Sequence, residues 1–207
     1  MVKVYIVGDS NYYINAIIDS QQVSNIVDAD VILFTGGEDV TPKLYNEIAH
    51  RTTCSNLFRD AIEVNVYREA LRFSNKLCVG ICRGCQFLTV MNGGKLIQNV
   101  NHHAIDETHP IELTSGEKID ITSTHHQMAY PFNLPTENYE ILGWATPPRS
   151  TIYEGSGIYW KPQFKEVEII YFPKTNCLGI QGHPELMPRN SETVTYINTL
   201  ITKYLNK

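Results

Sequence analysis

The sequence predicts an α/β protein with a mainly parallel sheet flanked by helices, to which antiparallel strands are added in the second half. Three observations lead to this expectation. Short apolar runs typical of buried strands alternate with helically spaced apolar residues as far as Met91. Beyond that point, alternating patterns on both sides of Ser115 and Gly116 indicate a hairpin. The turns rich in Gly and reactive side chains follow the ends of apolar runs, where open α/β sheets place their sites.

The first half of the chain is expected to alternate strands with helices. Apolar runs predict strands at 1–8, 31–34 and 77–81. Helices are expected at 10–19 and 56–74. The second helix has apolar residues at helical spacing: Leu57, Ala61, Val64, Tyr67 and Leu71.

The second half changes character. A hairpin is expected at 111–121, followed by strands at 139–144 and 166–171, which are predicted to be antiparallel additions to the sheet. An apolar run at 178–182 predicts a further strand. A last helix begins after Ser191, whose hydroxyl is a favoured N-cap.

A cysteine lies where the strand at 77–81 turns into a helix that ends before Gly93. Gly80 and Gly84 flank Cys82, and glycine permits the sharp reversal that such a junction needs. The thiol then points toward the helix N-terminus, whose dipole favours the thiolate. This is the strand–turn–helix arrangement of a nucleophile elbow, with sulfur in place of oxygen. We therefore expect Cys82 to be a nucleophile.

A nucleophilic cysteine needs a base, and the base needs an acceptor that orients it. The strand at 178–182 ends directly before His183, Pro184 and Glu185. Proline fixes the local backbone, so the two flanking side chains can converge and the carboxylate can hold one tautomer of the imidazole. The expected triad is Cys82, His183 and Glu185.

An acyl-transfer site also needs backbone N–H donors for the oxyanion, and glycine allows the backbone to approach closely. The strand at 31–34 opens directly into Gly36 and Gly37. One donor is expected from this turn and a second from the N–H of Arg83, the residue after the nucleophile. The side chain of Arg83 either contacts substrate or pairs with a carboxylate.

Four blocks of sequence occur in an order that resembles a known family. They are 35–42 with Tyr45, then 80–98, 123–127 and 179–185. Together they resemble the class I glutamine amidotransferase-like superfamily, most closely its γ-glutamyl hydrolase and γ-glutamyl-γ-aminobutyrate hydrolase branch, the C26 type of cysteine peptidase.

The resemblance implies a three-layer, flavodoxin-like fold in a single domain over residues 1–207. It also implies that Cys82 attacks the γ-amide carbon of a glutamyl group to give a thioester. His183 would protonate the leaving amine, and water would then release glutamate.

The same resemblance implies residues for the substrate. Gln86 and the backbone near Gly36 would hold the glutamyl part, while His126 and Gln127 would line the pocket. One position departs from the family pattern, because the residue before the histidine is usually a bulky aromatic and here it is Gly182.

Composition agrees with a compact enzyme. The chain has 207 residues, of which 43% are hydrophobic and 19% charged, so it is long and apolar enough to bury a core. The formal charge is −5 and no basic cluster occurs, which argues against a nucleic-acid partner. No apolar run approaches the length that spans a bilayer, so we expect no membrane association and a cytoplasmic location.

Five cysteines form an odd set, which is atypical of a disulfide scaffold. Cys82 and Cys85 make a C-x-x-C pair, and a redox pair or half of a zinc site is the alternative interpretation. No second such pair exists. We expect Cys85 to pack behind the nucleophile, and Cys78 and Cys177 to fill strand positions as small apolar residues.

Histidines gather in the middle of the chain, at His102, His103, His109, His125 and His126. Imidazole is a common zinc or iron ligand, but these positions match no compact ligand motif. We therefore expect no metal and no cofactor. The first three histidines are expected at the surface or in loops, and the last two at the pocket.

Three functions remain open at this point. The first is a γ-glutamyl amide hydrolase that acts alone on glutamine or on a γ-glutamyl amine or peptide. The second is a glutaminase subunit that delivers ammonia to a synthetase on another chain, and the third is a catalytically silent binding protein of the same fold. The segment at 146–157, punctuated by Pro and Gly, is either a lid or a surface connection.

Overall fold

The computed structural model describes residues 1–8, 11–155 and 165–207. Its main sheet has nine strands, and in chain order they are β1 (Val2–Val7), β2 (Ser20–Gln22), β3 (Val31–Phe34), β4 (Leu77–Ile81), β7 (Ala104–Leu113), β8 (Lys118–Thr124), β10 (Glu140–Ala145), β12 (Val167–Phe172) and β13 (Cys177–Ile180). Two small ribbons pair β5 (Lys95–Ile97) with β9 (Met128–Tyr130) and β6 (Asn99–Val100) with β11 (Tyr153–Glu154).

The helices are α1 (Leu57–Ala70), α2 (Arg83–Met91) and α3 (Glu192–Leu205). Short 3₁₀ helices complete the described elements: η1 (Asn11–Ala16), η2 (Ile26–Asp28), η3 (Pro42–Tyr45), η4 (Thr136–Asn138) and η5 (Pro184–Leu186). None of the helices within the described ranges is both long and apolar enough to cross a lipid bilayer.

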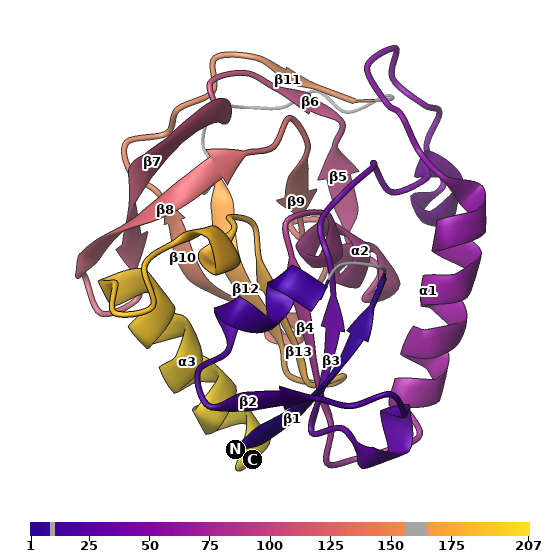
Figure 1. Cartoon of the computed structure of the whole chain (residues 1–207). Helices are drawn as coiled ribbons and strands as arrows, with labels where there is room; N and C mark the ends of the chain where they lie inside the picture. The colour runs from indigo at the N-terminus through magenta and orange to yellow at the C-terminus, as the bar shows by residue number, and fades with distance from the viewer. Residues whose placement is uncertain (9–10, 156–164) are drawn as a thin grey trace.

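The order of strands across the sheet is β2–β1–β3–β4–β13–β12–β10–β7–β8. The strands from β2 to β13 in this order are parallel to one another, and β12, β10, β7 and β8 extend the sheet with antiparallel pairings. Figure 1 shows the two halves joined into one curved sheet. The predicted α/β architecture, with a parallel first half and antiparallel additions, is confirmed.

Helices cover both faces of the sheet. One apolar cluster joins the strands to η1 and α3, and a second joins the opposite face to α1 and α2. The strands β3 and β4 are buried along their whole length, as expected of central parallel strands covered on both sides. The molecule therefore has three layers, with β4 and β13 in the middle of the sheet.

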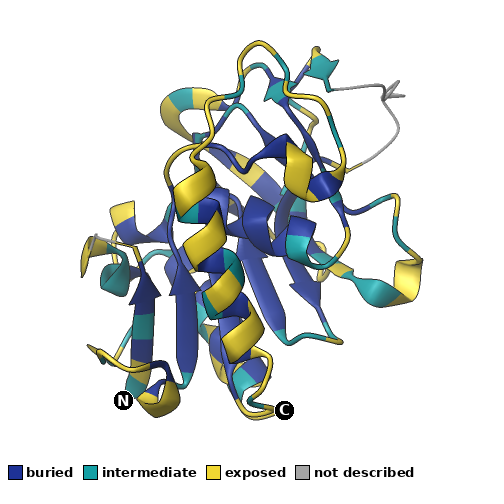
Figure 2. Ribbon diagram, turned by 90° about the vertical axis from the view of Figure 1, so that its right-hand side faces the viewer, coloured by how far each residue is buried: buried dark blue, intermediate teal, exposed yellow. Residues whose placement is uncertain are grey.

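Two sequence expectations were wrong in detail. The region expected to be a helix at 10–19 contains the shorter 3₁₀ helix η1, followed by the edge strand β2. The helix expected at 56–74 forms as α1, but Leu57 and Leu71 lie on its exposed side. Figure 2 shows that outer face of α1 exposed to solvent.

The buried face of α1 carries two acidic residues, Asp60 and Glu63, together with Tyr67. Both carboxylates bind the buried guanidinium of Arg83 in α2. The face that α1 turns toward the protein interior is therefore set by a polar contact, which a hydrophobic pattern cannot reveal.

The segment at 146–157 contains β11, which pairs with β6, and its residues 156–157 lie outside the described ranges.

Candidate active site

Cys82 occupies the junction between β4 and α2 in a backbone conformation that L-residues rarely adopt, with φ 53° and ψ −108°. A Cβ atom on Gly80 would lie 2.3 Å from the carbonyl oxygen of Gly84, and one on Gly84 would lie 2.2 Å from that of Phe34. Side chains at either glycine would force α2 away from the sheet. The flanking glycines thus hold the helix directly against the strands and create the sharp turn predicted for Cys82.

The chain leaves β13 beside the same turn. Ile180 is the register partner of Ile81, and its carbonyl oxygen accepts a hydrogen bond from the backbone N–H of Cys82 at 2.7 Å. Three residues later, Nδ1 of His183 lies 2.6 Å from Oε1 of Glu185. Parallel pairing of neighbouring strands therefore brings together the three residues expected to form the triad.

The environment of His183 determines its charge. Burial alone would lower its pKa, but hydrogen bonds with Cys82 and Glu185 outweigh burial and raise the pKa of His183 to about 10. The imidazole is therefore protonated near neutral pH and has a proton to donate. The backbone N–H of His183 donates to Oγ1 of Thr122 at 2.6 Å, which ties the backbone of this residue to β8.

The glycine turn after β3 lies against this group. A Cβ atom on Gly36 would lie 2.6 Å from the hydroxyl oxygen of Tyr13, 3.0 Å from Cε1 of His183 and 3.6 Å from Cβ of Cys82. Only glycine fits at this position without displacing its neighbours. Gly37 has φ +135°, which glycine adopts most readily.

Arg83 is the first residue of α2, so its backbone N–H has no carbonyl partner within the helix. Its side chain is buried and points away from the turn toward α1, where it pairs with Asp60 and Glu63. Its Nε donates to the carbonyl oxygen of Glu38 at 3.0 Å. Of the two roles considered for this side chain, the structure therefore shows pairing with carboxylates.

A pocket of about 180 Å³ opens beside Cys82. The residues predicted to bind substrate, Gln86, His126 and Gln127, all line it, together with Gly37, Glu38, Asp39, Cys54, Arg83, Thr124 and His125. Nε2 of Gln86 donates to the carbonyl oxygen of Gln127 at 2.9 Å, which ties α2 to the loop after β8. A hydrogen bond with Asp39, at 3.1 Å, raises the pKa of His126.

Sequence reasoning missed two residues at this site. Tyr13 of η1 packs beside His183, with ring centroids 6.3 Å apart, and burial together with the nearby Glu185 and Cys82 raises the pKa of Tyr13 to about 12. Cys54 is exposed and lines the pocket. Neither lies in a recognisable motif, and only the tertiary fold brings them to the site.

The departure at Gly182 has a steric explanation. A Cβ atom there would lie 2.4 Å from Cγ1 of Ile121 and 2.7 Å from the carbonyl oxygen of Thr122. The backbone of β8 thus occupies the space into which a side chain at this position would project. Gly182 allows β8 to pack directly against the segment that carries His183.

The expectation for the histidines was wrong at His109, which lies buried in β7 and not at the surface or in a loop. His103 lies in the loop before β7, as expected, but it is buried, and His125 is buried beside it. They are held by Glu166 and Glu168 of the antiparallel half of the sheet. Hydrophobic periodicity does not predict buried ionisable clusters of this kind.

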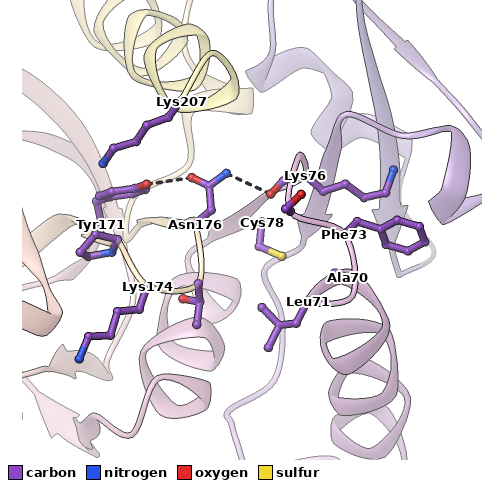
Figure 3. Close-up of a pocket in the computed structure, with 12 residues that line it drawn as sticks. Ala70, Leu71, Phe73, Lys76, Cys78, Tyr171, Lys174, Asn176 and Lys207 are labelled. Carbon is purple, nitrogen blue, oxygen red and sulfur yellow. Dashed lines mark hydrogen bonds between the residues drawn. The ribbon is translucent and has the colours of Figure 1, made fainter.

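A second pocket, of about 390 Å³, lies at the opposite end of β4 (Figure 3). Asn176 links the hydroxyl of Tyr171 to the carbonyl oxygen of Lys76 at its wall. A hydrogen bond to Cys177, together with burial, raises the pKa of Cys78 well above its ordinary value. None of the described residues lining this pocket is a histidine, so its buried thiol has no imidazole base there.

Comparison with known proteins identifies the family of this chain. The family model described as Peptidase C26 matches residues 8–145, a segment that includes Gly36, Cys82 and His126. The chain belongs to the peptidase C26 family. The match ends before His183 and Glu185. Membership assigns the chain to the class I glutamine amidotransferase-like superfamily, as the sequence blocks predicted, and hence to its hydrolases and amidotransferases.

Relatives among the curated proteins agree with this family assignment. Protein NtpR of Enterococcus hirae is 26% identical over 174 residues, covering 79% of this chain and 70% of NtpR. The glutamine amidotransferase-like protein YvdE of Lactococcus lactis is 29% identical over 160 residues, covering 75% of this chain and 66% of YvdE. This peptidase C26 chain thus spans about two thirds of the length of these relatives.

Solved structures share the fold at low identity. A Thermoplasma acidophilum protein described as part of a GMP synthase superposes with a TM-score of 0.63 at 15% identity, covering 100% of this chain and 94% of the other. The glutaminase domain of Trypanosoma brucei CTPS gives 0.57 at 12% identity, with the same coverage. These similarities establish the fold and leave substrate and partner to be argued from the site.

Proposed function

We propose that this chain hydrolyses the γ-amide bond of a glutamyl group through a covalent thioester on Cys82. The observation that carries the proposal is the meeting of a strained cysteine, a histidine paired with a glutamate and a glycine turn at the carboxyl ends of neighbouring parallel strands. A nucleophile, an acid and backbone donors are the parts that acyl transfer requires. Membership of the peptidase C26 family supports the same class of reaction.

In the proposed first step the sulfur of Cys82 attacks the γ-carbonyl carbon, and the bond between that carbon and the amide nitrogen breaks. His183 gives its proton to the departing nitrogen, which leaves as ammonia or an amine. Glu185 holds the imidazole at 2.6 Å and stabilises its positive charge. These roles make the cysteine the nucleophile and the histidine the general acid.

In the second step water attacks the thioester carbon and passes a proton to His183, acting as base. The carbon–sulfur bond breaks, glutamate leaves, and the thiolate and imidazolium are restored. The carbonyl oxygen carries negative charge in both steps. We assign its stabilisation to backbone N–H groups of the Gly36–Gly37 turn and of Arg83, because helix N-terminal N–H groups lack internal partners.

The glutamyl part would occupy the pocket beside Cys82. Its α-ammonium and α-carboxylate need groups of opposite charge, and the pocket lining offers Glu38 and Asp39 on one hand and His126 on the other. Gln86 and Gln127 would complete the wall, with Gln86 held in place by its bond to the loop after β8. We propose these residues as the substrate contacts.

A second candidate function is a glutaminase subunit that passes ammonia to a synthetase on another chain. Phe58 and Ile62 of α1 expose 76% and 46% of their surfaces, and both line a hollow that also includes Gly36. Apolar side chains exposed beside a reactive site suit a docking partner. Two structural neighbours are described as part of a synthase and as a glutaminase domain, which supports this alternative.

Glutamate release from three substrates distinguishes the two functions. We would incubate the purified chain with glutamine, γ-glutamyl-aminobutyrate and a γ-glutamyl peptide, with Cys82→Ser as the inactive control. Turnover of a γ-glutamyl amine or peptide that Cys82→Ser abolishes indicates a hydrolase that acts alone. Activity confined to glutamine, and raised by an added synthetase, indicates the subunit. Turnover by folded Cys82→Ser at the wild-type rate would refute both.

A further inference from the structure

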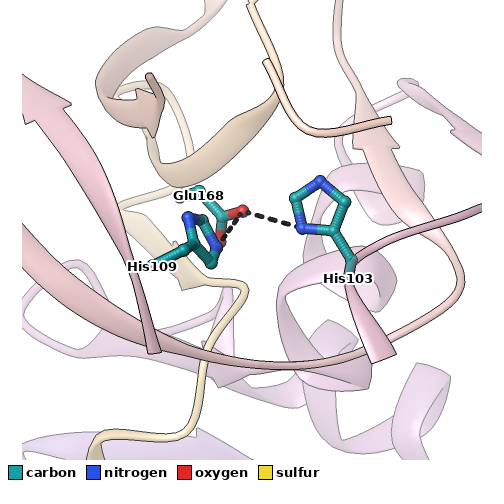
Figure 4. Close-up of side chains that lie close together, drawn as sticks. All are labelled: His103, His109 and Glu168. Carbon is teal, nitrogen blue, oxygen red and sulfur yellow. Dashed lines mark ion pairs between the residues drawn. The ribbon is translucent and has the colours of Figure 1, made fainter. Parts of the chain in front are cut away.

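Three histidines and two glutamates meet inside the antiparallel half of the molecule. They come from separate segments of the chain, and each exposes 4% of its surface or less: His103, His109, His125, Glu166 and Glu168. Figure 4 shows His103, His109 and Glu168 turned toward one another. The mechanism proposed for Cys82 uses none of these side chains, so the cluster needs its own explanation.

The inward-facing atoms surround one carboxylate oxygen. Oε1 of Glu168 lies 3.3 Å from Nε2 of His109, 3.5 Å from Nδ1 of His103 and 3.8 Å from Nε2 of His125. The ligand atoms of His103, His109 and Glu168 all lie within 4.8 Å of one another. Ligands bound tetrahedrally to zinc at about 2.0–2.1 Å lie roughly 3.3–3.5 Å apart. The cluster is therefore close to the spacing of a zinc site.

The outward-facing ring nitrogens all meet acceptors. Nδ1 of His109 lies 3.2 Å from the carbonyl oxygen of Pro110, and Nδ1 of His125 lies 2.9 Å from that of Gln127. A carbonyl oxygen can only accept, so each of these nitrogens carries the hydrogen. In the neutral imidazoles of His109 and His125, the inward nitrogen then carries no hydrogen and has a free lone pair, which is the form that binds a metal.

His103 follows the same pattern through a carboxylate. Its Nε2 lies 3.2 Å from Oε2 of Glu166, while its Nδ1 faces Glu168. The hydroxyl of Ser123 lies 3.2 Å from Nδ1 and donates its own hydrogen to the carbonyl oxygen of His103 at 2.8 Å, so its oxygen accepts from Nδ1, and a metal ion bound at Nδ1 would displace that hydrogen. Histidines that bind zinc through one ring nitrogen commonly donate the hydrogen of the other ring nitrogen to a carboxylate, which orients the ring.

Lone pairs aimed at a carboxylate repel it unless a positive charge lies between them. Within the described part of the chain, four buried atoms of this cluster make no hydrogen bond: both carboxylate oxygens of Glu168, Nε2 of His109 and Nε2 of His125. Over the same residues, the basic side chains within ion-pair distance of Glu166 and Glu168 are histidines, and no lysine or arginine lies that close. The carboxylate of Glu166 accepts hydrogen bonds from the backbone N–H groups of Arg149 and Ser150, whereas that of Glu168 has no such donors. A divalent cation would compensate the buried charge of Glu168 and bind the lone pairs of His109 and His125.

We propose that His103, His109 and Glu168 bind a structural zinc ion, with His125 as the fourth ligand. Imidazole nitrogens with one carboxylate oxygen suit zinc, and full burial leaves no open position for a substrate. The ion would tie β7 and β12 to the loop after β8. That loop lines the proposed substrate pocket, so zinc would stabilise its wall without taking part in the reaction.

The experiment is metal analysis of the untagged protein by mass spectrometry, combined with cobalt substitution and thermal unfolding. We expect about one zinc per chain, a lower Tm after removal by a chelator, and recovery when zinc is returned. Chelator-treated protein titrated with Co²⁺ should show the visible absorption bands of tetrahedral cobalt. None of these readouts depends on catalytic activity, so failure of the proposed hydrolysis would leave them unaffected.

Variants locate the ion. His109→Gln and Glu168→Gln should lose the bound zinc and the cobalt bands, whereas His102→Asn, at an exposed neighbour with φ 62° that asparagine tolerates, should retain both. If a variant fails to fold, the wild-type cobalt spectrum still decides. The proposal is overturned if the folded wild-type protein contains no zinc, binds neither zinc nor cobalt, and keeps its Tm after chelation. Zinc retained by both cluster variants would also overturn it.

Discussion

Glu63 of α1 and Arg83, the residue after the candidate nucleophile, form an ion pair that is buried on both sides. Asp60, one turn earlier, binds the same guanidinium at 2.5 Å. The contact joins the helix that covers the sheet to the helix that begins at Cys82. It therefore links the stability of the fold to the placement of the reactive turn.

Replacement of Glu63 by glutamine should destabilise the protein. The guanidinium would lose one of its two charged partners in the interior, and breaking a buried pair costs roughly 3 kcal/mol of unfolding free energy. Urea denaturation followed by circular dichroism measures the change. Glu69→Gln, at an exposed position of the same helix, is the matched control and should shift stability by less than about 0.5 kcal/mol. Equal stability of the two variants would contradict this account of Arg83.

The sequence was sufficient to predict the parts of the site that depend on local geometry. The junction at Cys82 was predicted because strand, glycine and helix patterns adjoin, and His183 because an apolar strand ends just before it. Parallel pairing then placed the two together, since neighbouring parallel strands end at the same edge.

Other parts could not be predicted, because they arise from long-range polar contacts. The acidic face of α1 and the buried His103 and His109 oppose the rule that ionisable residues lie outside. Tyr13 reaches the site only through the packing of η1 against η5. None of these residues stands in a periodic pattern, and each is fixed by a partner that is distant in the sequence.

The charge state of His183 can be tested by pH. Its pKa is raised to about 10 from an ordinary value of about 6.5, so the protonated ring stabilises the fold fully below pH ~6.5 and this stabilisation is lost as pH rises through about 10. An NMR titration of the ring should show this raised pKa. In Cys82→Ser and in Glu185→Gln the pKa should fall, because each variant replaces a group that can carry negative charge beside the imidazolium with a neutral one. An unchanged titration in both would contradict the proposed pairing.

A methyl group at Gly36 should impair catalysis more than folding. It would lie 2.6 Å from the hydroxyl of Tyr13 and 3.0 Å from the ring of His183, so both groups must move. Displacement of about 1 Å at a reacting centre can cost on the order of 100-fold in rate. We expect Gly36→Ala to lower kcat/KM for glutamate release by about that factor. Gly116→Asn, in a hairpin turn with φ +86° that asparagine tolerates better than alanine and with nothing within 4 Å of an added Cβ, should leave it unchanged. Equal activity of the two variants would rule out the close packing described.

Alkylation should separate the cysteines by reactivity. Cys54 is exposed, so iodoacetamide can reach it, while burial raises the pKa of Cys85 well above its usual value and should protect it. Cys82, beside a protonated imidazole and at a helix N-terminus, should react faster than Cys54 although only 8% of its surface is exposed. Peptide mass spectrometry over a time course in Cys54→Ser and wild-type protein measures the order. Rapid labelling of Cys54 with Cys82 unmodified would contradict the assignment of the nucleophile.

The most direct test of the central claim is to trap the intermediate. Wild-type protein would be mixed with a γ-glutamyl substrate, quenched in acid within one turnover, digested and examined by mass spectrometry. The account predicts a mass increase of one glutamyl group on the peptide that contains Cys82, absent from Cys82→Ser, which should also release no glutamate. Glutamate release by folded Cys82→Ser at the wild-type rate, with no adduct on Cys82 in the wild type, would contradict it.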